Sequence, residues 1–517
     1  MIGAEALVRS LVASGVDVVF ANPGTSEMHF VATLDAVPEM RGVLALFEGA
    51  ATGAADGYAR MRDRPAAVLL HLGPGLGNGL ANLHNARRAR APVVAIVGDH
   101  ATYHKQFDAP LESDIDTVAR NVSTWIRRSV RAEDAGADAA AAVAAACGPP
   151  GQVATLILPA DVSWSEGGLV APPVQRTPRA TVRAETLDEV AAALRSREKT
   201  ALLLGGRALR EPAVQAAYRI ARATGAEVLA ETFPARAERG AGIPVVQRLA
   251  YLAEMAAGQL DGLRHLILVD TKSPVSFFAY PGKPSDLVPD GCDVSVLAGG
   301  GDDAVAALES LAAELGGEPQ SAVPDTPRPE KPSGELSAES IARAIGALLP
   351  EGAIVSDEAN TSGTFLPAFT AGAPRHDWLS LTGGSIGQGL PVALGAAVAC
   401  PDRPVLALEA DGSALYTLQS LWSMAREQLD VTTVIFSNRR YAILRMELAR
   451  VGATASGERA LEMLDISPPE IDFVALARGF GVPATRPESA EGFATDLQRA
   501  FAEPGPHLIE AVIPSLF

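Results

Sequence analysis

Short apolar runs alternate with longer alanine-rich stretches along most of this chain. The runs are rich in leucine and β-branched residues, which is typical of buried strands, and the stretches between them are typical of helices. This alternation predicts parallel sheets covered by helices on both faces. The runs lie at residues 16–20, 67–71, 93–97, 153–158, 201–204, 265–269, 353–356, 405–408, 432–436 and 507–511.

Two proline-rich segments without apolar periodicity, roughly 163–186 and 316–335, interrupt the pattern. They leave three blocks of ordinary domain size. We therefore expect an α/β chain of three doubly wound parallel-sheet domains, at residues 1–165, 186–320 and 336–517. Such domains bind ligands beside the carboxyl ends of their strands, so we expect the functional residues in the loops at those ends.

Composition and charge narrow the possible functions. The chain has 517 residues, of which 48% are hydrophobic, and a formal net charge of −18. An acidic surface repels nucleic acid and anionic membranes, so neither is expected as a partner. Residues 1–20 predict an amphipathic helix followed by a strand rather than an export signal, so a cytoplasmic location is expected. Cys147, Cys292 and Cys400 fit neither a disulfide framework nor a zinc site, and we expect small buried side chains there.

Two strand ends in the last block carry oxygen-rich side chains. Asp411, Gly412 and Ser413 follow the run 405–408, and Asn438 follows the next one. A carboxylate and an amide at neighbouring strand ends suit Mg²⁺, and a serine there can donate to a phosphate. An Asp-Gly-Ser sequence is also an ordinary turn, so the pattern leaves both interpretations open.

Glu48 ends a short apolar run in the first block and precedes a small-residue helical segment that contains Asp56-Gly57-Tyr58. A glutamate in this position also serves as an ordinary helix cap.

His71 opens a second segment in the first block, with Gly73, Gly75, Gly77 and Gly79. A dinucleotide site with Asp99 as its acidic partner is the competing interpretation. The alternating glycines and Pro74 argue against it, because the dinucleotide fingerprint needs a different glycine spacing.

These motifs together resemble those of thiamine diphosphate enzymes. The Asp411-Gly412-Ser413 sequence, followed by Asn438 and then Tyr441-Ala-Ile-Leu, is similar to their cofactor motif, with Ala410 and Ser437 in place of a usual glycine and asparagine. The Glu48 segment resembles their pyrimidine-domain signature. The resemblance covers the whole chain, in the domain order shared by acetolactate synthases and benzoylformate decarboxylase.

The resemblance implies catalytic and metal-binding roles. Glu48 is expected to hydrogen-bond the pyrimidine ring, so that the amino group of the ring removes the C2 proton. His71 is similar to the active-site histidine of benzoylformate decarboxylase, although it would also serve as a loop cap. The other expected catalytic residues are Thr25 and Ser26, and the expected Mg²⁺ ligands are the side chains of Asp411 and Asn438 and the carbonyl of Arg440.

Cofactor contacts follow from the same resemblance. Gly384 is expected to offer its carbonyl to the aminopyrimidine, and Ile386 is expected to be the wedge under the thiazolium ring that brings the imino nitrogen close to C2. The remaining expected contacts are Asn22, Pro23, Gly24, Gly75, Asn78, Asn360, Thr361, Ser362, Gly412, Ser413, Ala414 and Tyr441. FAD is not expected, because Gly205-Gly206 in the middle block is only a strand-end turn.

The implied reaction is decarboxylation of a small-molecule 2-oxo acid with transfer of the acyl carbanion to a second carbonyl, as in acetolactate synthases. A benzoylformate decarboxylase-like enzyme without ligation is one alternative, and a cofactor-binding scaffold without turnover is another. Leu111 stands where the synthases have a glutamine, and Phe277, Phe278 and Tyr280 would line an apolar wall or pack in the core. Because Glu48 and Asp411 lie in different domains, the resemblance implies sites between chains, hence a homodimer at least and commonly a tetramer.

Overall fold

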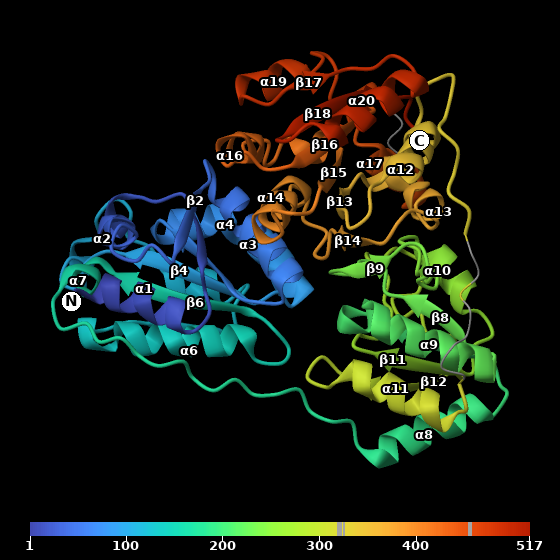
Figure 1. Cartoon of the computed structure of the whole chain (residues 1–517), viewed down its shortest axis with the longest axis horizontal. Helices are drawn as coiled ribbons and strands as arrows, with labels where there is room; N and C mark the ends of the chain where they lie inside the picture. The colour runs from blue at the N-terminus through green and yellow to red at the C-terminus, as the bar shows by residue number, and fades with distance from the viewer. Residues whose placement is uncertain (318–322, 324–325, 453–456, 517) are drawn as a thin grey trace.

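The structure is a computed structural model and describes residues 1–317, 323, 326–452 and 457–516. Its strands form three sheets, which Figure 1 shows as separate blue, green and orange-to-red bodies. The strand orders are β2-β1-β3-β4-β6-β5, β10-β8-β7-β11-β12 and β17-β18-β16-β15-β13-β14-β9. The predicted α/β class with three doubly wound sheets is confirmed. The domain boundaries stay predictions, and part of the segment 316–335 lies outside the described residues.

The first sheet lies between two helical layers. Figure 1 shows α1 and α6 on one face and α3 and α4 on the other, and each face has its own apolar cluster. The strands are β1 (Val18–Ala21), β2 (Arg41–Leu44), β3 (Ala66–Leu70), β4 (Val93–Asp99), β5 (Trp125–Arg128) and β6 (Val153–Pro159). The helices are α1 (Gly3–Ala13), α2 (Met28–Thr33), α3 (Glu48–Arg62), α4 (Leu72–Ala89), α5 (Ile115–Ala119), α6 (Ala135–Cys147) and α7 (Ala160–Trp164).

The middle sheet is parallel throughout and begins in its centre with β7. Its strands are β7 (Thr200–Leu204), β8 (Glu227–Ala230), β10 (Gln247–Arg248), β11 (His265–Val269) and β12 (Asp293–Ala298). Its helices are α8 (Ala184–Arg195), α9 (Glu211–Thr224), α10 (Ala253–Leu260) and α11 (Ala304–Glu314).

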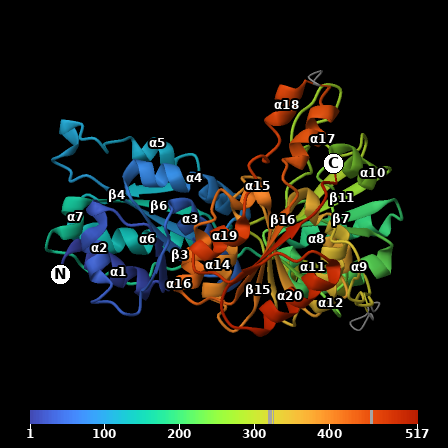
Figure 2. The same cartoon turned by 90° about the horizontal axis from the view of Figure 1, so that it is seen from above.

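The last sheet is the largest, and Figure 2 shows α17 and α18 projecting from its domain. Its own strands are β13 (Ile354–Glu358), β14 (His376–Ser380), β15 (Val405–Ala410), β16 (Val431–Ser437), β17 (Ala484–Thr485) and β18 (His507–Val512). Its helices are α12 (Ala338–Leu348), α13 (Leu366–Phe369), α14 (Gly389–Ala399), α15 (Asp411–Ala414), α16 (Ser420–Arg426), α17 (Ala442–Arg450), α18 (Glu458–Glu462), α19 (Phe473–Gly479) and α20 (Ala490–Ala502).

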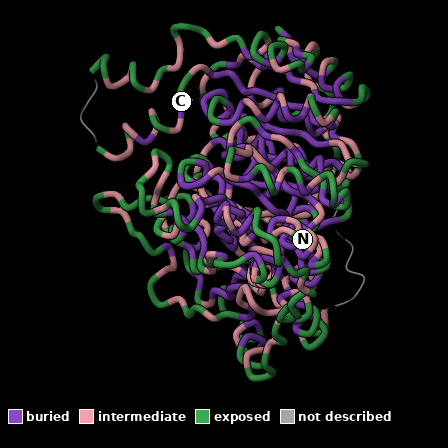
Figure 3. The backbone as a smooth tube through the Cα atoms, turned by 90° about the vertical axis from the view of Figure 1, so that its left-hand side faces the viewer, coloured by how far each residue is buried: buried purple, intermediate pink, exposed green. Residues whose placement is uncertain are grey.

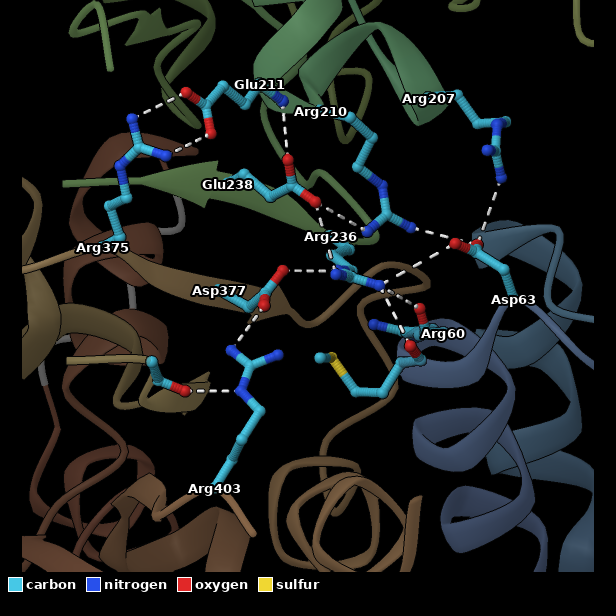
Figure 4. A network of polar contacts seen from close by, with 12 residues as sticks. Arg60, Asp63, Arg207, Arg210, Glu211, Arg236, Glu238, Arg375, Asp377 and Arg403 are labelled. Atoms are coloured by element: carbon cyan, nitrogen blue, oxygen red, sulfur yellow. Dashed lines mark hydrogen bonds and ion pairs between the residues drawn. The ribbon is translucent and has the colours of Figure 1, made fainter. Parts of the chain in front are cut away.

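One strand of the last sheet comes from the middle of the chain. β9 (Ala237–Arg239) pairs antiparallel with β14, with Ala237 opposite Trp378. Just before it, Arg236 donates to the backbone carbonyl of Arg60 at 3.1 Å and pairs with Asp377 in β14. Figure 4 shows this guanidinium where all three domains meet. The middle segment therefore joins the first domain to the last.

Helices α3 and α14 pack closely across the boundary between the first and last domains. Side chains at Gly57 and Gly395 would collide with the carbonyl oxygens of Val392 and Ala54. The small residues after Glu48 thus allow two helix backbones to touch. Buried residues of both helices belong to one apolar cluster, within the buried interior that Figure 3 shows in purple.

The three cysteines and the lengths of the helices can be compared with the sequence analysis. Cys147, Cys292 and Cys400 are free, and they are half-buried rather than fully buried. Within the residues that the structure describes, no helix has both the length and the apolar character needed to cross a bilayer.

Candidate active site

Asp411 lies at the carboxyl end of β15 and is 2% exposed. Its Oδ1 accepts from the backbone N–H of Gly412 at 2.8 Å, and its Oδ2 accepts from the N–H of Arg439 at 2.5 Å. Burial raises the pKa of this carboxyl to about 6 although backbone N–H groups oppose the shift. A divalent cation beside it would favour the ionised form, so the environment fits a metal ligand.

Asn438 follows β16 and adds an amide oxygen to the same place. Its Oδ1 accepts from the N–H of Arg440 at 3.0 Å, and its Nδ2 donates to Ser362 Oγ at 3.3 Å. Among the described residues, none donates a hydrogen bond to the carbonyl of Arg440. No group of three or more His, Cys, Asp or Glu residues that could hold a metal occurs in the described part of the chain. A cation here would therefore need amide, carbonyl and phosphate oxygens as well as Asp411.

Polar side chains from a third strand end border this cluster. Asn360 follows β13, and its Nδ2 donates to Ser413 Oγ at 3.0 Å. A side chain at Gly412 would lie 2.6 Å from the ring of Tyr441, which explains the glycine. Ala414 is fully buried beside them, whereas the side chain of Thr361 makes no hydrogen bond with a described residue. Most of the predicted diphosphate contacts thus come together.

The loop of residues 381–388 follows β14 and carries Gly384 and Ile386. Gly384 has a φ of 73°, and a side chain there would lie 2.5 Å from the ring of Phe277. No described residue donates to the Gly384 carbonyl, which leaves it available to a ligand. Ile386 is half-buried.

Glu358 holds the end of this loop by hydrogen bonds, a role that the sequence analysis missed. Its carboxylate accepts from the backbone N–H groups of Gly387, at 2.7 Å, and Gly389. Burial raises its pKa to about 7. The signal in the sequence was a carboxylate that ends the apolar run 353–356, the same pattern as at Asp411.

Glu48 is the first residue of α3 and is 7% exposed. Its Oε2 accepts from Asn78 Nδ2 at 3.1 Å, and Gly75 lies against its Oε1. Both partners lie inside α4, because this helix begins at Leu72 directly after His71 rather than after a glycine-rich loop. Helix α4 therefore supports the glutamate side chain of α3.

His71 lies beside Glu27, a second residue that the sequence analysis missed. The Nδ1 of His71 is 2.9 Å from Glu27 Oε2 and 3.2 Å from Ser26 Oγ. The Glu27 side chain is 1% exposed, and it also accepts from the N–H of Gly24 at 2.8 Å. Leu72 turns the chain after His71 with a φ of 51°, a conformation that costs a non-glycine residue about 1–3 kcal/mol.

The rest of the Asn22–Glu27 loop contributes less. Thr25 is exposed, and Asn22 and Pro23 are half-buried without a hydrogen bond from their side chains to a described residue. A side chain at Gly24 would overlap the His71 ring, so the glycine allows the histidine to approach the loop.

The two clusters are not joined by hydrogen bonds within one chain. Among the described residues, no hydrogen bond or ion pair joins the Glu48 and His71 side chains to Asp411 or Asn438. Phe277 and Phe278 are 43% and 54% exposed, so they are not core residues. Exposed apolar side chains close in sequence to Glu48, Asp411 or Asn438 are Leu46, Leu415, Tyr416 and Leu444, and the segment after β4 exposes Tyr103, Phe107 and Leu111.

The turn at Gly205-Gly206 is lined by carboxylates. The N–H of Gly206 already donates to Glu231 Oε1 at 3.1 Å, and Asp270 accepts from the N–H of Arg207 at 2.8 Å. Arg90 of the first domain pairs with Asp270. Because these N–H groups have anionic partners, the turn is poorly suited to the pyrophosphate of a dinucleotide, and the expectation of no FAD stays a prediction.

The three-sheet architecture with acidic groups at the strand ends is that of a thiamine diphosphate-dependent enzyme. Residues 1–120 match the thiamine pyrophosphate enzyme N-terminal TPP binding domain, and residues 360–511 match the C-terminal TPP binding domain. The chain is 63% identical to a Mycobacterium tuberculosis protein described as "Putative acetolactate synthase large subunit IlvX", with 100% of both chains covered. This chain belongs to the thiamine pyrophosphate enzyme family, as the resemblance predicted.

Two further relatives are decarboxylases. The benzoylformate decarboxylase of Pseudomonas aeruginosa is 29% identical, over 96% of each chain. A solved structure, the thiamine diphosphate-dependent 4-hydroxybenzoylformate decarboxylase of Rhodococcus jostii, matches with a TM-score of 0.86 at 25% identity, over 99% of each chain. The relatives therefore include both kinds of 2-oxo acid enzyme that the sequence analysis considered.

Proposed function

We propose that this protein is a thiamine diphosphate- and Mg²⁺-dependent decarboxylase of a 2-oxo acid that releases an aldehyde. When bound, the cofactor supplies the nucleophilic carbon that attacks the keto carbon and takes up the electron pair freed with CO₂. The observation that carries the proposal is the pairing of His71 with Glu27, beside the glutamate that the family motif places at the pyrimidine.

The residues of the chain would divide the work between two clusters. Asp411, Asn438 and the Arg440 carbonyl would hold Mg²⁺, and Asn360 and Ser413 would bind the diphosphate. The free carbonyl of Gly384 would accept from the aminopyrimidine. Glu48, held by Asn78, would exchange a proton with the pyrimidine ring.

The choice of product rests on where a proton donor lies. Release of an aldehyde needs a proton at the former keto carbon, whereas ligation needs that carbon kept free of protons until a second carbonyl arrives. His71 Nδ1 lies 2.9 Å from the Glu27 carboxylate and donates to it, so Nε2 is the nitrogen left to face a substrate. With a proton on both nitrogens, the ring would give up its Nε2 proton and keep the Nδ1 proton on the Glu27 side. We therefore place decarboxylation ahead of ligation, in the reverse of the order that the sequence motifs favoured.

Ligation in the manner of an acetolactate synthase is the second candidate. It is favoured by the description of the relative that is 63% identical over the whole chain. Leu111, 38% exposed, stands where the synthases have a glutamine. Without that amide, the chain has one polar group fewer for holding an acceptor keto acid.

We also propose that two chains form each site. In the described part of one chain no hydrogen bond or ion pair joins the two clusters. The exposed side chains of Leu46 and Tyr416 lie close in sequence to Glu48 and Asp411, and the exposed Phe277 ring lies beside Gly384. A second copy that places its Glu48 opposite Asp411 would bury these side chains and complete the site.

The test is incubation of the purified protein with Mg²⁺, thiamine diphosphate and a panel of aliphatic and aromatic 2-oxo acids, with CO₂ and organic products measured together. Aldehyde as the main product supports the decarboxylase proposal. A hydroxy keto acid formed from pyruvate would overturn that proposal in favour of a carboligase. Glu48→Gln serves as the control. CO₂ release that is absent from the native protein for every substrate would favour a scaffold without turnover.

A further inference from the structure

Asn85 holds the backbone between Gly384 and Ile386. This residue lies in α4 of the first domain and is 0% exposed. Its Nδ2 donates to the carbonyl of Ser385 at 2.8 Å, and its Oδ1 accepts from the N–H of Ser385 at 3.3 Å. One side-chain amide therefore satisfies both backbone groups of the residue that separates the expected carbonyl acceptor from the expected wedge.

Neighbouring side chains of α4 hold the same loop. Asn82 Nδ2 donates to the carbonyl of Gly387 at 3.1 Å, and His84 Nε2 is 3.2 Å from the carbonyl of Gly383. Asn85 Nδ2 also donates to Asn82 Oδ1 at 3.0 Å, which joins the two side chains. A side chain at Gly383 would overlap Asn85 Oδ1, which fixes how closely the loop approaches the helix.

Helix α3 adds a second set of contacts to the loop. Gln388 Nε2 donates to Asp56 Oδ2 at 2.8 Å, and Arg60 Nη2 donates to Thr382 Oγ1 at 3.0 Å. Both α3 and α4 thus contact the loop with their C-terminal halves. Their N-terminal halves carry Glu48 and the residues that support it.

Asn78 and Asn85 are seven residues apart on α4, so they lie on nearly the same face, about 10 Å apart along the axis. Asn78 faces Glu48, and Asn85 faces the loop. If sites form between chains, the Glu48 of one chain serves the site on its partner's last domain. The Asn85 of that same chain arranges the loop of its own last domain, which belongs to the other site. This step rests on the proposed function.

We propose that Asn85 is a positioning residue that sets the Gly384 carbonyl and Ile386 of its own chain, so that each first domain serves two sites. Other contacts hold the loop at Gly383 and Gly387, but between Gly384 and Ile386 the backbone hydrogen bonds with described residues are those of Asn85. A displacement of about 1 Å at a reacting group can cost about 100-fold in rate. Loss of the amide would therefore slow proton exchange at C2 of bound thiamine diphosphate, with little effect on the diphosphate contacts.

The first experiment measures C2 hydrogen–deuterium exchange of bound thiamine diphosphate, which needs no substrate. Asn85→Asp, and Asn85→Ser in case the buried charge prevents folding, are each expected to slow exchange about 100-fold. The melting temperature and cofactor affinity are recorded in parallel. Ser129→Ala is the matched control, because Ser129 is equally buried in the same domain and donates to Asp138 at 2.8 Å, away from the loop. Unchanged exchange in both Asn85 variants would overturn the proposal.

The second experiment uses mixed oligomers isolated with two different affinity tags. A Glu48→Gln chain paired with an Asn85→Asp chain is expected to regain one fast-exchanging cofactor per two chains, because one of the two sites then has neither change. Both changes on one chain, paired with an unchanged chain, should leave no site that exchanges at the native rate. Absence of recovery in the first mixture would place Asn85 on the Glu48 side and overturn the proposal.

A third mixture separates this inference from the proposed function. Glu48→Gln paired with Asp411→Ala tests only whether sites form between chains, and it should also regain one fast site per two chains. Recovery here without recovery in the Asn85 mixture removes the role of Asn85 alone. If this control mixture regains no fast-exchanging site, active sites do not form between chains, and the proposal for Asn85 is overturned as well.

Discussion

Arg60 Nη1 donates to the backbone carbonyl of Ser380 at 2.9 Å. The bond joins the helix that begins with Glu48 to the last residue of β14, directly before the loop that carries Gly384. The same nitrogen donates to the carbonyl of Ala235 at 3.2 Å, so one guanidinium contacts all three domains. Figure 4 shows Arg60 beside Arg236, whose own guanidinium reaches back to the end of α3.

Arg60→Met should destabilise the fold strongly. Arg60 also binds Asp56, with Nη2 2.5 Å from Oδ2, and both side chains are almost fully buried. The substitution leaves a buried carboxylate without its partner, which costs about 3–5 kcal/mol. Thermal and urea unfolding would measure the loss.

The matched control is Arg343→Met, since Arg343 pairs with Glu339 at the same spacing but both are 46% exposed. It should cost less than about 1 kcal/mol. Asp56→Asn added to Arg60→Met should restore part of the stability. Equal losses of unfolding free energy from Arg60→Met and Arg343→Met would show that the buried pair contributes no more to stability than the exposed pair.

Asp411→Asn should weaken Mg²⁺ binding in the presence of thiamine diphosphate by at least about tenfold. The buried carboxylate is the only acidic side chain among the expected ligands, and an amide cannot supply its charge. Calorimetric titration with Mg²⁺ measures the change. Asp402→Asn, in an exposed turn before β15, should leave the affinity unchanged. An unchanged Mg²⁺ affinity in Asp411→Asn would remove this residue from the metal site.

Glu27→Gln should change the product more than it changes cofactor binding. The substitution keeps the size of the side chain but removes the charge that holds His71 Nδ1 at 2.9 Å. Aldehyde release should slow about 100-fold, the range of a lost general acid, while cofactor affinity stays the same. The rates of CO₂ and aldehyde formation, measured together, provide the test. His71→Ala should give the same product ratio, and a normal aldehyde rate in both variants would exclude a proton transfer through this pair.

His376 should make the fold less stable in acid. Burial, and then the nearby Arg239 guanidinium, lower its pKa from 6.5 to about 4. Between these two values the unfolded chain binds a proton that the folded chain does not, so stability falls as the pH drops from about 6.5 to about 4. The full effect is about 3 kcal/mol.

His376→Asn tests this effect, because its amide can keep the donor that His376 Nδ1 offers to the Pro374 carbonyl at 2.7 Å. The variant should lose less stability than the native protein between pH 6.5 and pH 4. His29→Asn, at an exposed position, is the control. Parallel pH curves for the native protein and His376→Asn would contradict the assignment.

Several features followed from local sequence alone. Strands β3 and β4 consist largely of continuous apolar runs because both of their faces are buried, so the pattern marks them directly. Asp411 and Asn438 follow such runs, and parallel strands place their carboxyl ends at one edge. For this reason the sequence could predict that they meet.

Other features depend on contacts that no local pattern records. Glu27 and His71 are 44 residues apart, and their pairing depends on the turn at Leu72 and on the absence of a side chain at Gly24. Asn85 and Ser385 are separated by 300 residues. A side chain reaches such a partner only after the sheets have packed and the domains have docked.

The amino-acid sequence by itself determined the strands, the three-domain class and the oxygen-rich strand ends, because each is encoded by residues close together in the chain. Only the tertiary structure decided that β9 joins the last sheet, that Glu27 holds His71 and that Asn85 holds the loop of Gly384. The physical reason is that these contacts join residues far apart in the chain. Glu27 and His71 meet when the first domain packs, whereas β9 and Asn85 reach the last domain only once the domains have docked, with α3 packed closely against α14.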